Sequence, residues 1–256
     1  MRLPSLLAFL RFFATALSVL LCSLPARAAN PDALWQLVSQ QCVPNSIEKG
    51  DPAPCALVDS AHGFVILKDN VGIAQYLLIP TARLAGIESR ELQRADAPNF
   101  WRYAWEQRQR IGAALGQTLQ PSQIGLEVNS AAARSQLQLH IHMDCMRPDL
   151  PLALQTHQHD RFGQWMQLTI DGHTYSVMRL PADVLQSDDP FKLVAARSDF
   201  AASAMAAQSL LLTGARFDDG SSGFYLINMP VNFDKGEAGS AEVLLDHSCA
   251  IARMTK

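Results

Sequence analysis

The sequence has no excess of basic residues and no closely spaced pair of cysteines, and both absences restrict what it binds. Its 256 residues include 21 Lys and Arg against 24 Asp and Glu, whereas nucleic-acid-binding surfaces are strongly basic. Structural zinc sites usually draw on closely spaced cysteine pairs, and the five cysteines here contain none. We therefore expect neither nucleic acid nor a structural zinc ion as a partner.

Long disordered stretches are not indicated either. Apolar residues make up 48% of the chain and charged residues 18%, which is an ordinary globular balance. The length is enough for one large domain or for two fused half-domains.

The longest apolar run in the N-terminal region, from Phe12 to Leu24, is shorter than the roughly 20 residues of a membrane-spanning helix. Arg2 and Arg11 precede this run, and Ala26-Arg27-Ala28 places small residues where a signal peptidase reads them. The run from Leu3 would be long enough to span a membrane if Arg11 reached the interface. We expect residues 1–28 to be a signal peptide or an uncleaved membrane anchor.

Export changes the interpretation of the cysteines. Four of them, Cys42, Cys55, Cys145 and Cys249, follow the expected export segment and would meet an oxidising compartment. Two disulfides are therefore predicted. Of the three possible connectivities we favour Cys42 with Cys55 and Cys145 with Cys249.

Periodicity predicts a hairpin, a helix and two strands in the first half. Residues 63–68 and 73–80 form two β-rich runs around the turn signal Asp69-Asn70-Val71-Gly72, and a long amphipathic helix follows Pro98. Residues 123–129 and 135–143 are typical of strands. In the latter, aliphatic residues alternate with His140 and His142, which places both histidines on one face.

The second half has a similar succession of elements: a strand at 174–181, a helix at about 191–212, and strands at 224–228 and 243–249. This order suggests a duplication, although two unrelated α+β halves could share it. We expect an α+β fold with an antiparallel sheet and helices on one face. Its first half would comprise residues 29–160 and its second half residues 161–256.

A His-x-His pair on one strand face has three chemical uses. It can hold a metal, with Asp144, His157 or His159 as a third ligand, or it can supply a nucleophile with an orienting neighbour. It can also simply be hydrogen-bonded. The pair alone does not choose among these.

The residues around the pair resemble the histidine triad superfamily of nucleotide hydrolases and transferases. Asn129, Gln136, His140 and His142 match its Asn…Gln-x-x-x-His-x-His block in order and spacing. The segment from Gln75 to Leu84 is similar to the superfamily's His-φ-φ-φ-Ile-Pro-x-x-His-φ, where φ is apolar. Gln75 and Arg83 stand where that pattern has histidines.

Within the superfamily, the string from Arg134 to Asp149 resembles the CDP-diacylglycerol pyrophosphatases of bacterial envelopes. The resemblance implies hydrolysis of CDP-diacylglycerol to CMP and phosphatidate through a covalent cytidylyl-histidine, without a metal or other cofactor. It also implies a membrane surface as partner and an inner-membrane location with the catalytic part in the periplasm. The residues implied are His142 and His140 in catalysis, and Asn129, Gln136, Arg134, Gln75, Asp144 and Arg147 in substrate binding.

The resemblance leaves two registers for the nucleophile. Counting from Gln136 makes His142 the middle member of the triad and Asp144 the third, and the Asn129 spacing agrees. The other register centres on His140. Two rival functions stay open: a nucleotidyltransferase with the same intermediate, and a non-enzymatic envelope protein that binds metal through His140, His142 and Asp144.

Overall fold

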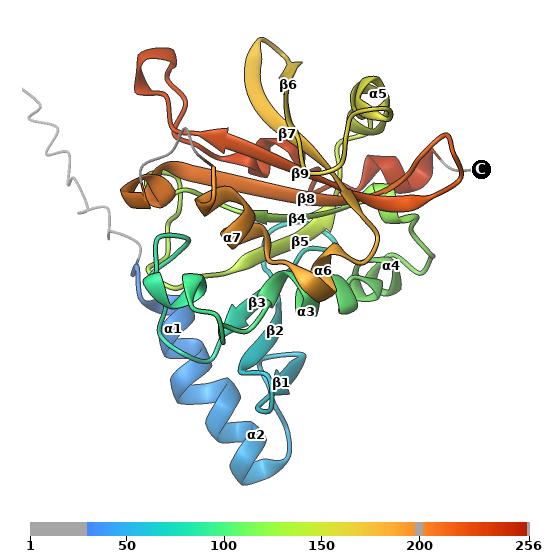
Figure 1. Cartoon of the computed structure of the whole chain (residues 1–256). Coiled ribbons are helices and arrows are strands. Elements are labelled where there is room, and N and C mark those ends of the chain that lie inside the picture. Colours follow the sequence, from blue (N-terminus) through green and yellow to red (C-terminus); the bar gives the residue numbers. More distant parts are fainter. Residues whose placement is uncertain (1–29, 198–201, 255–256) are drawn as a thin grey trace, which may run out of the picture.

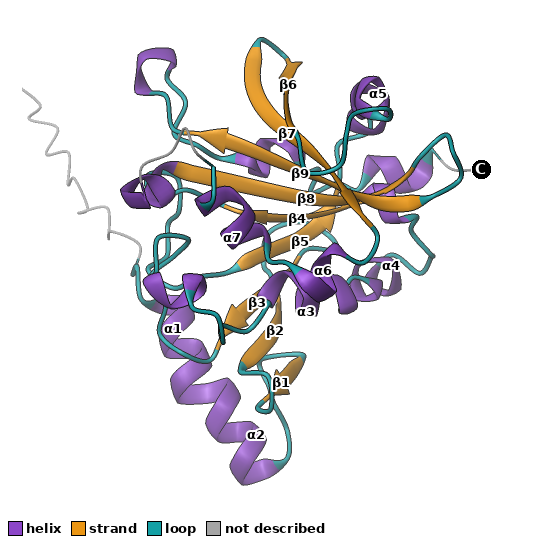
Figure 2. Cartoon of the chain, in the orientation of Figure 1, coloured by secondary structure: helices purple, strands orange, loops and turns teal. Residues whose placement is uncertain are grey.

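The computed structural model describes residues 30–197 and 202–254, so the expected signal or anchor segment at 1–28 lies outside the described residues. One nine-stranded sheet forms the centre of the molecule, and neighbouring strands are antiparallel throughout (Figures 1 and 2). The coarse prediction of an antiparallel sheet with helices is confirmed. No helix within the described ranges is long and apolar enough to cross a membrane.

The strands are β1 (Leu57–Asp59), β2 (Phe64–Lys68), β3 (Tyr76–Pro80), β4 (Ile124–Val128), β5 (Ile141–Cys145), β6 (Trp165–Ile170), β7 (His173–Pro181), β8 (Gln208–Arg216) and β9 (Ser222–Pro230). The α-helices are α1 (Ala33–Leu37), α2 (Val43–Lys49), α3 (Phe100–Glu106), α4 (Gln109–Ala114), α5 (Leu150–Leu154), α6 (Val184–Ser187) and α7 (Pro190–Ala195). A π-helical turn, Val38–Cys42, joins α1 to α2, and short 3-10 turns occupy several of the connections.

The strand order repeats between the two halves of the sheet. Across the sheet the order is β1-β2-β3-β5-β4-β8-β9-β7-β6. The first half thus contains a hairpin, β2-β3, followed by β5 and β4. The second contains a hairpin, β6-β7, followed by β9 and β8, and the two halves meet where β4 pairs with β8. The repeat differs from the expected succession, because β9, which contains residues 224–228, corresponds to β5 and not to β4, and the edge strand β1 has no counterpart in the second half.

Helices cover both faces of the sheet, so the prediction of helices on one face is wrong. Val65, Leu77 and Ile79 pack beneath the α1–α2 column in one cluster of buried residues. Phe64 and Leu78, whose side chains alternate to the opposite face, join the main core with α3. The strands at this end are buried from both sides because apolar residues occupy both sets of alternating positions.

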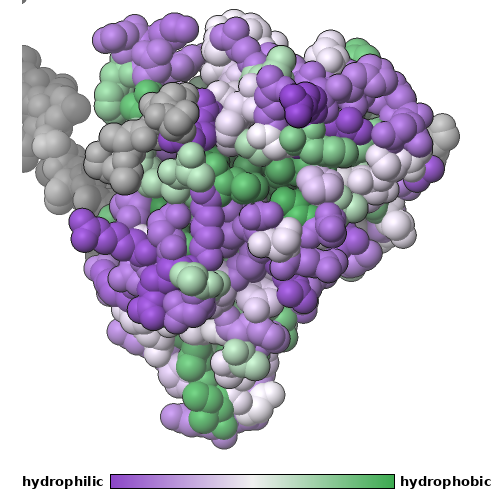
Figure 3. Space-filling model, in the orientation of Figure 1, coloured by the Kyte–Doolittle hydropathy of each residue, from purple (hydrophilic) through white to green (hydrophobic). Residues whose placement is uncertain are grey.

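Disulfides stabilise the two ends of the described chain, and both predicted pairings are confirmed. Cys42–Cys55 ties the α1–α2 column to the segment before β1, and Cys145–Cys249 ties β5 to the C-terminal segment. The far tip of the α1–α2 column has apolar surface (Figure 3), and Ile47 of α2 is 73% exposed.

The predicted helix at 191–212 is wrong. The helix α7 ends at Ala195, and Leu210, Leu211 and Leu212 lie in β8. Every residue of β8 except Arg216 is buried, and a continuous apolar run does not distinguish a doubly covered strand from a buried helix. In the repeated strand order, β8 corresponds to β4 and β9 to β5.

Two predicted strands also need correction. Strand β5 begins at Ile141, not at Ser135, because the backbone N–H groups of Leu137 and Leu139 donate to Pro31 and Leu84 instead of to a neighbouring strand. The segment 243–249 is not a strand. There Asp246 accepts hydrogen bonds from the backbone N–H groups of Ser248 and Ala250, which turns the chain.

Candidate functional site

A cavity of about 320 Å³ opens between α1, the β2–β3 turn and the loop that joins β4 to β5. The β2–β3 turn contributes Asp69 and Val71, and the N-terminal helix contributes Ala33 and Leu34. The other lining residues are Gln75, Leu77, Asn129, Ala133, Arg134, Ser135, Gln136, His140, His142 and Glu242. The two histidines singled out by the sequence therefore share one cavity.

Strand β5 positions the histidine pair. His142 lies opposite Leu77 of β3 and Glu127 of β4, while Ile141 and Met143 enter the core on the other face. The alternation predicted from the sequence is confirmed for His142. The ring centroids of His140 and His142 are 4.9 Å apart, and both side chains are largely buried.

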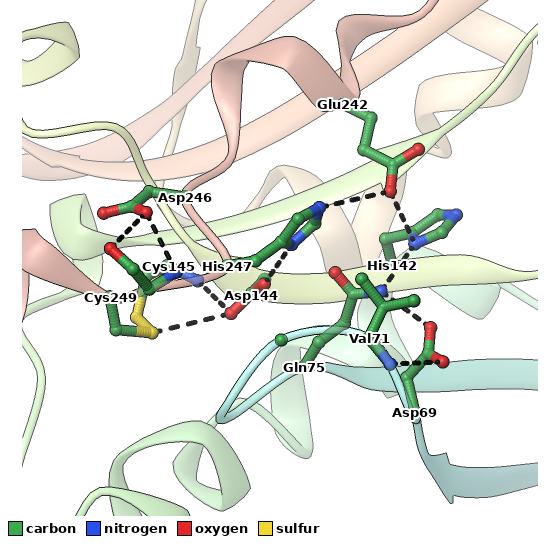
Figure 4. Close-up of polar contacts among 12 residues, drawn as sticks. Asp69, Val71, Gln75, His142, Asp144, Cys145, Glu242, Asp246, His247 and Cys249 are labelled. Carbon is green, nitrogen blue, oxygen red and sulfur yellow. Dashed lines mark hydrogen bonds and ion pairs between the residues drawn. A yellow bond between two sulfur atoms is a disulfide. The ribbon is translucent and has the colours of Figure 1, made fainter.

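His142 has polar neighbours on its Nδ1 side (Figure 4). The Nε2 of Gln75 lies 3.2 Å from Nδ1 and also donates to Asp69 at 2.7 Å, and Oε1 of Glu242 lies 3.6 Å from Nδ1. The Nε2 atom of His142 is buried and has no hydrogen-bond partner among the described residues. An unpaired buried nitrogen costs roughly 1 to 3 kcal/mol, so this atom is poised to interact with a ligand.

His140 is held differently. Its Nδ1 lies 2.7 Å from the backbone carbonyl oxygen of Gln138, which can only accept, so Nδ1 carries the ring proton and Nε2 has the lone pair. Burial lowers the pKa of His140 to about 4, and the neighbouring His142 adds to this effect. Burial likewise lowers the pKa of His142 to about 4, against the opposing influence of Asp69. Both rings are neutral near pH 7.

Two glutamates that sequence reasoning missed adjoin the pair. Glu127 is fully buried on β4, where Ser209 donates to its Oε1 at 2.8 Å and its Oε2 has no partner within the described chain. Burial, and then the nearby Glu242, raise the pKa of Glu127 well above its usual value. Glu242 comes from the C-terminal segment and accepts from Nδ2 of Asn129 at 2.8 Å. A carboxylate in an otherwise apolar strand was the available signal for Glu127.

Asp144 lies beneath the site, not in the cavity. It is fully buried at the end of β5, where its Oδ2 lies 2.8 Å from Nδ1 of His247. The opposite edge of that imidazole ring points toward Glu242, and Nε2 of His247 lies 3.6 Å from Oε1 of Glu242 (Figure 4). Asp144 and His247 thus lie behind Glu242 as seen from His142.

Comparison with known proteins identifies the family to which this site belongs. A family model described as CDP-diacylglycerol pyrophosphatase matches residues 29–253. The chain belongs to the CDP-diacylglycerol pyrophosphatase family. It is also similar to the CDP-diacylglycerol pyrophosphatase of Yersinia pestis, with 39% identity over 227 residues that cover 88% of this chain and 86% of the relative. The resemblance inferred from the string at 134–149 is confirmed.

Four of the six expected substrate-binding residues line the cavity of this CDP-diacylglycerol pyrophosphatase family member: Gln75, Asn129, Arg134 and Gln136. Arg134 is paired in a bidentate manner with Glu88, with both N–O distances 2.6 Å. The amide of Gln136 binds the backbone of Asn30 and Leu34. The structure does not bring Arg147 to the site, because it pairs with Asp149 and Asp171 at a separate cavity.

A metal could be held at a different set of residues from the one expected. Single ligand atoms of Glu127, His142 and Glu242 lie within 4.8 Å of one another. The expected set of His140, His142 and Asp144 does not form such a group among the described residues, because Asp144 is directed toward His247. A second group, around Asp144, includes Cys145 and Cys249, whose sulfur atoms are joined to each other.

Proposed function

We propose that the protein hydrolyses the pyrophosphate bond of CDP-diacylglycerol and releases CMP and phosphatidate. Family membership supports the substrate, and one observation connects it to the cavity. The unpartnered Nε2 of His142 lies at a cavity-lining residue beside Asn129, Gln136 and His140, the residues of the superfamily block.

In the proposed mechanism, His142 attacks the cytidylyl phosphorus through Nε2. The N–P bond forms while the bond to the bridging oxygen breaks, and phosphatidate leaves with that oxygen as a phosphomonoester. Water then attacks the same phosphorus, breaks the N–P bond and releases CMP. This route needs the ring proton on Nδ1, facing Glu242, so the hydrogen bond from Gln75 must open when substrate binds.

The alternative nucleophile is His140. The spacings from Asn129 and Gln136 favour His142, as does the carboxylate of Glu242 that faces its Nδ1. The hydrogen bond from Nδ1 of His140 to Gln138 favours His140, because it already leaves a lone pair on Nε2. We assign the attack to His142 and a supporting role in the cavity to His140.

Stabilising the negative charge of the pyrophosphate requires hydrogen-bond donors, and the loop between β4 and β5 supplies them. The backbone N–H groups of Ser135 and Gln136 make no hydrogen bond within the described part of the chain. The guanidinium group of Arg134 lies at the same wall of the cavity, and its buried Nε has no partner among the residues that the structure describes. These groups would bind the oxygens of the transition state.

The fold relationship belongs to the same proposal. We infer a histidine triad-like origin with a duplicated half, in which only the first half keeps the histidines. The repeated strand order supports the duplication, and the match of Asn129, Gln136, His140 and His142 to the block supports the superfamily.

The cavity mouth suits a substrate with acyl chains. Val71 lines the cavity and is 50% exposed, and Leu137, beside the lining residue Gln136, is 43% exposed. The chain that follows the proposed signal or anchor enters at this rim, because Pro31 accepts from the backbone of Leu137. We propose that the mouth faces the membrane, with the protein at the periplasmic side of the inner membrane.

The test is incubation of the purified protein with CDP-diacylglycerol, with CMP and phosphatidate identified as products. Equal product release in the presence of a chelator would exclude the metal-binding rival. A nucleotidyltransferase would instead transfer CMP to an added alcohol or phosphate acceptor. Failure to release CMP under all these conditions would contradict the proposal.

A further inference from the structure

A string of acidic and imidazole groups leads from the core to the proposed nucleophile (Figure 4). It begins at buried Asp144, passes through His247 at 2.8 Å and reaches Glu242 at 3.6 Å. From the same oxygen of Glu242, a further 3.6 Å leads to Nδ1 of His142. One carboxylate oxygen therefore faces two imidazole rings.

His247 is held from three sides. Its carbonyl oxygen accepts from the backbone N–H of Ile73, and the adjacent residue Asp246 donates its backbone N–H to Cys145. The disulfide between Cys145 and Cys249 closes the third side. These contacts fix the backbone around His247, and its ring is directed from this fixed segment to Asp144 and Glu242.

The turn at Gly72 also fits closely against this histidine. Gly72 has a φ of +69°, and a Cβ added there would lie 3.1 Å from Cβ of His247 and 3.3 Å from Oδ2 of Asp144. A larger residue would press on both members of the pair. The turn that supplies Asp69 and Val71 to the cavity thus also packs on the Asp144–His247 pair.

The chemistry of the string follows from what each group can donate. Asp144 accepts at Nδ1 of His247, so the imidazolium form of His247 presents its second N–H to Glu242. This form places one positive charge between two carboxylates. Oε1 of Glu242 can accept a second hydrogen bond, and it faces Nδ1 of His142. The proton on this Nδ1 needs an acceptor when the ring becomes cationic.

We propose that His247, oriented by Asp144, is a positioning residue that holds Glu242 against Nδ1 of the nucleophile His142. This inference rests on the proposed function. As the Nε2–P bond forms and the bond to the lipid phosphate breaks, the Nδ1 proton stays on the ring and is hydrogen-bonded to Glu242. His247 neither contacts the substrate nor gains or loses a proton in the overall reaction.

The test compares His247→Ala with His173→Ala in the full-length protein. His173 is the matched control, because its Nδ1 lies 2.8 Å from Glu237 in a cavity separate from that of the histidine pair. We expect His247→Ala to lower kcat roughly 10- to 100-fold with KM changed less than about threefold, the equivalent of about 1.4 to 2.7 kcal/mol. The control should keep wild-type kcat.

Added imidazole distinguishes positioning from a loss of structure. It should restore a large part of kcat to His247→Ala and have no effect on His173→Ala, and His247→Gln provides a second variant if the alanine variant misfolds. Wild-type kcat in either His247 variant, or a loss that imidazole does not restore in a variant with wild-type melting temperature, would overturn the inference. A wild-type protein that releases no CMP would instead contradict the proposed function.

Discussion

The two halves of the sheet have the same strand order but differ in what their strands carry. A single row of paired residues crosses both halves on one face: Leu77, His142, Glu127, Leu211, Ile227 and Val177. His142 and Glu127, the polar members, belong to β5 and β4. Their counterparts in the second half, on β9 and β8, are Ile227 and Leu211.

This difference shows that the same strand order can carry either polar or aliphatic residues at corresponding positions. The strand order and the antiparallel pairing are alike in the two halves, yet the buried histidine and carboxylate of the row occur only in the first. Burying these polar groups is costly unless a ligand or a partner satisfies them. The second half avoids this cost with aliphatic residues, and we infer that it acts as a scaffold.

Alanine substitution at one position of this row in each half is the strongest test of the comparison. We expect His142→Ala to lower kcat on the order of 10⁴-fold or more while leaving the melting temperature nearly unchanged. Ile227→Ala should do the opposite and cost about 2 to 5 kcal/mol of stability, because it leaves a cavity in a fully buried position. A large loss of kcat in His140→Ala with normal turnover in His142→Ala would move the nucleophile to His140.

The two disulfides should differ in the stability that they contribute. In the chain-entropy model, Cys145–Cys249, with 104 residues of separation, contributes up to about 4.7 kcal/mol, and Cys42–Cys55, with 13, contributes about 3 kcal/mol. Urea unfolding of the two paired Cys→Ser variants measures this. Greater destabilisation from losing Cys42–Cys55 would show that the link between β5 and the C-terminal segment is not the stronger constraint.

The neutral histidines of the first half should make stability depend on pH. Their pKa values of about 4 in the folded protein lie below the usual 6.5, so the unfolded state binds more protons between these values. The free energy of unfolding should therefore fall as pH drops from 6.5 to 4, by up to about 3 kcal/mol for one histidine. A His140→Asn/His142→Asn double variant should lose this slope, and an unchanged slope would contradict the assignment.

Glu127 should give an effect of opposite sign. Because burial raises its pKa in the folded protein, the unfolded state releases its proton first, and stability falls as pH rises above about 4.5. The free energy of unfolding of Glu127→Gln should therefore exceed that of the wild type by a margin that grows as pH rises from 5 to 7. Glu48→Gln, at an exposed position of α2, provides the control, and parallel curves for the wild type and Glu127→Gln would disprove the raised pKa.

The sequence predicted the parts of this architecture that depend on local pattern. The turn at Asp69–Gly72 identified the β2–β3 hairpin, and alternation placed His142 on the face opposite Ile141 and Met143. It could not predict Glu242 and His247, about 100 residues from β5, because an isolated bridge and a disulfide bring them there. It also misassigned β8, since the burial of both strand faces depends on tertiary packing.

Reaction in water enriched in oxygen-18 tests the central claim most directly. Attack by a histidine on the cytidylyl phosphorus, followed by hydrolysis at the same atom, predicts that the label appears in CMP and is absent from phosphatidate. A quench without acid should also trap the nucleotide on wild-type protein but not on His142→Ala. Label in phosphatidate would mean attack at the lipid phosphorus and would contradict the proposed mechanism.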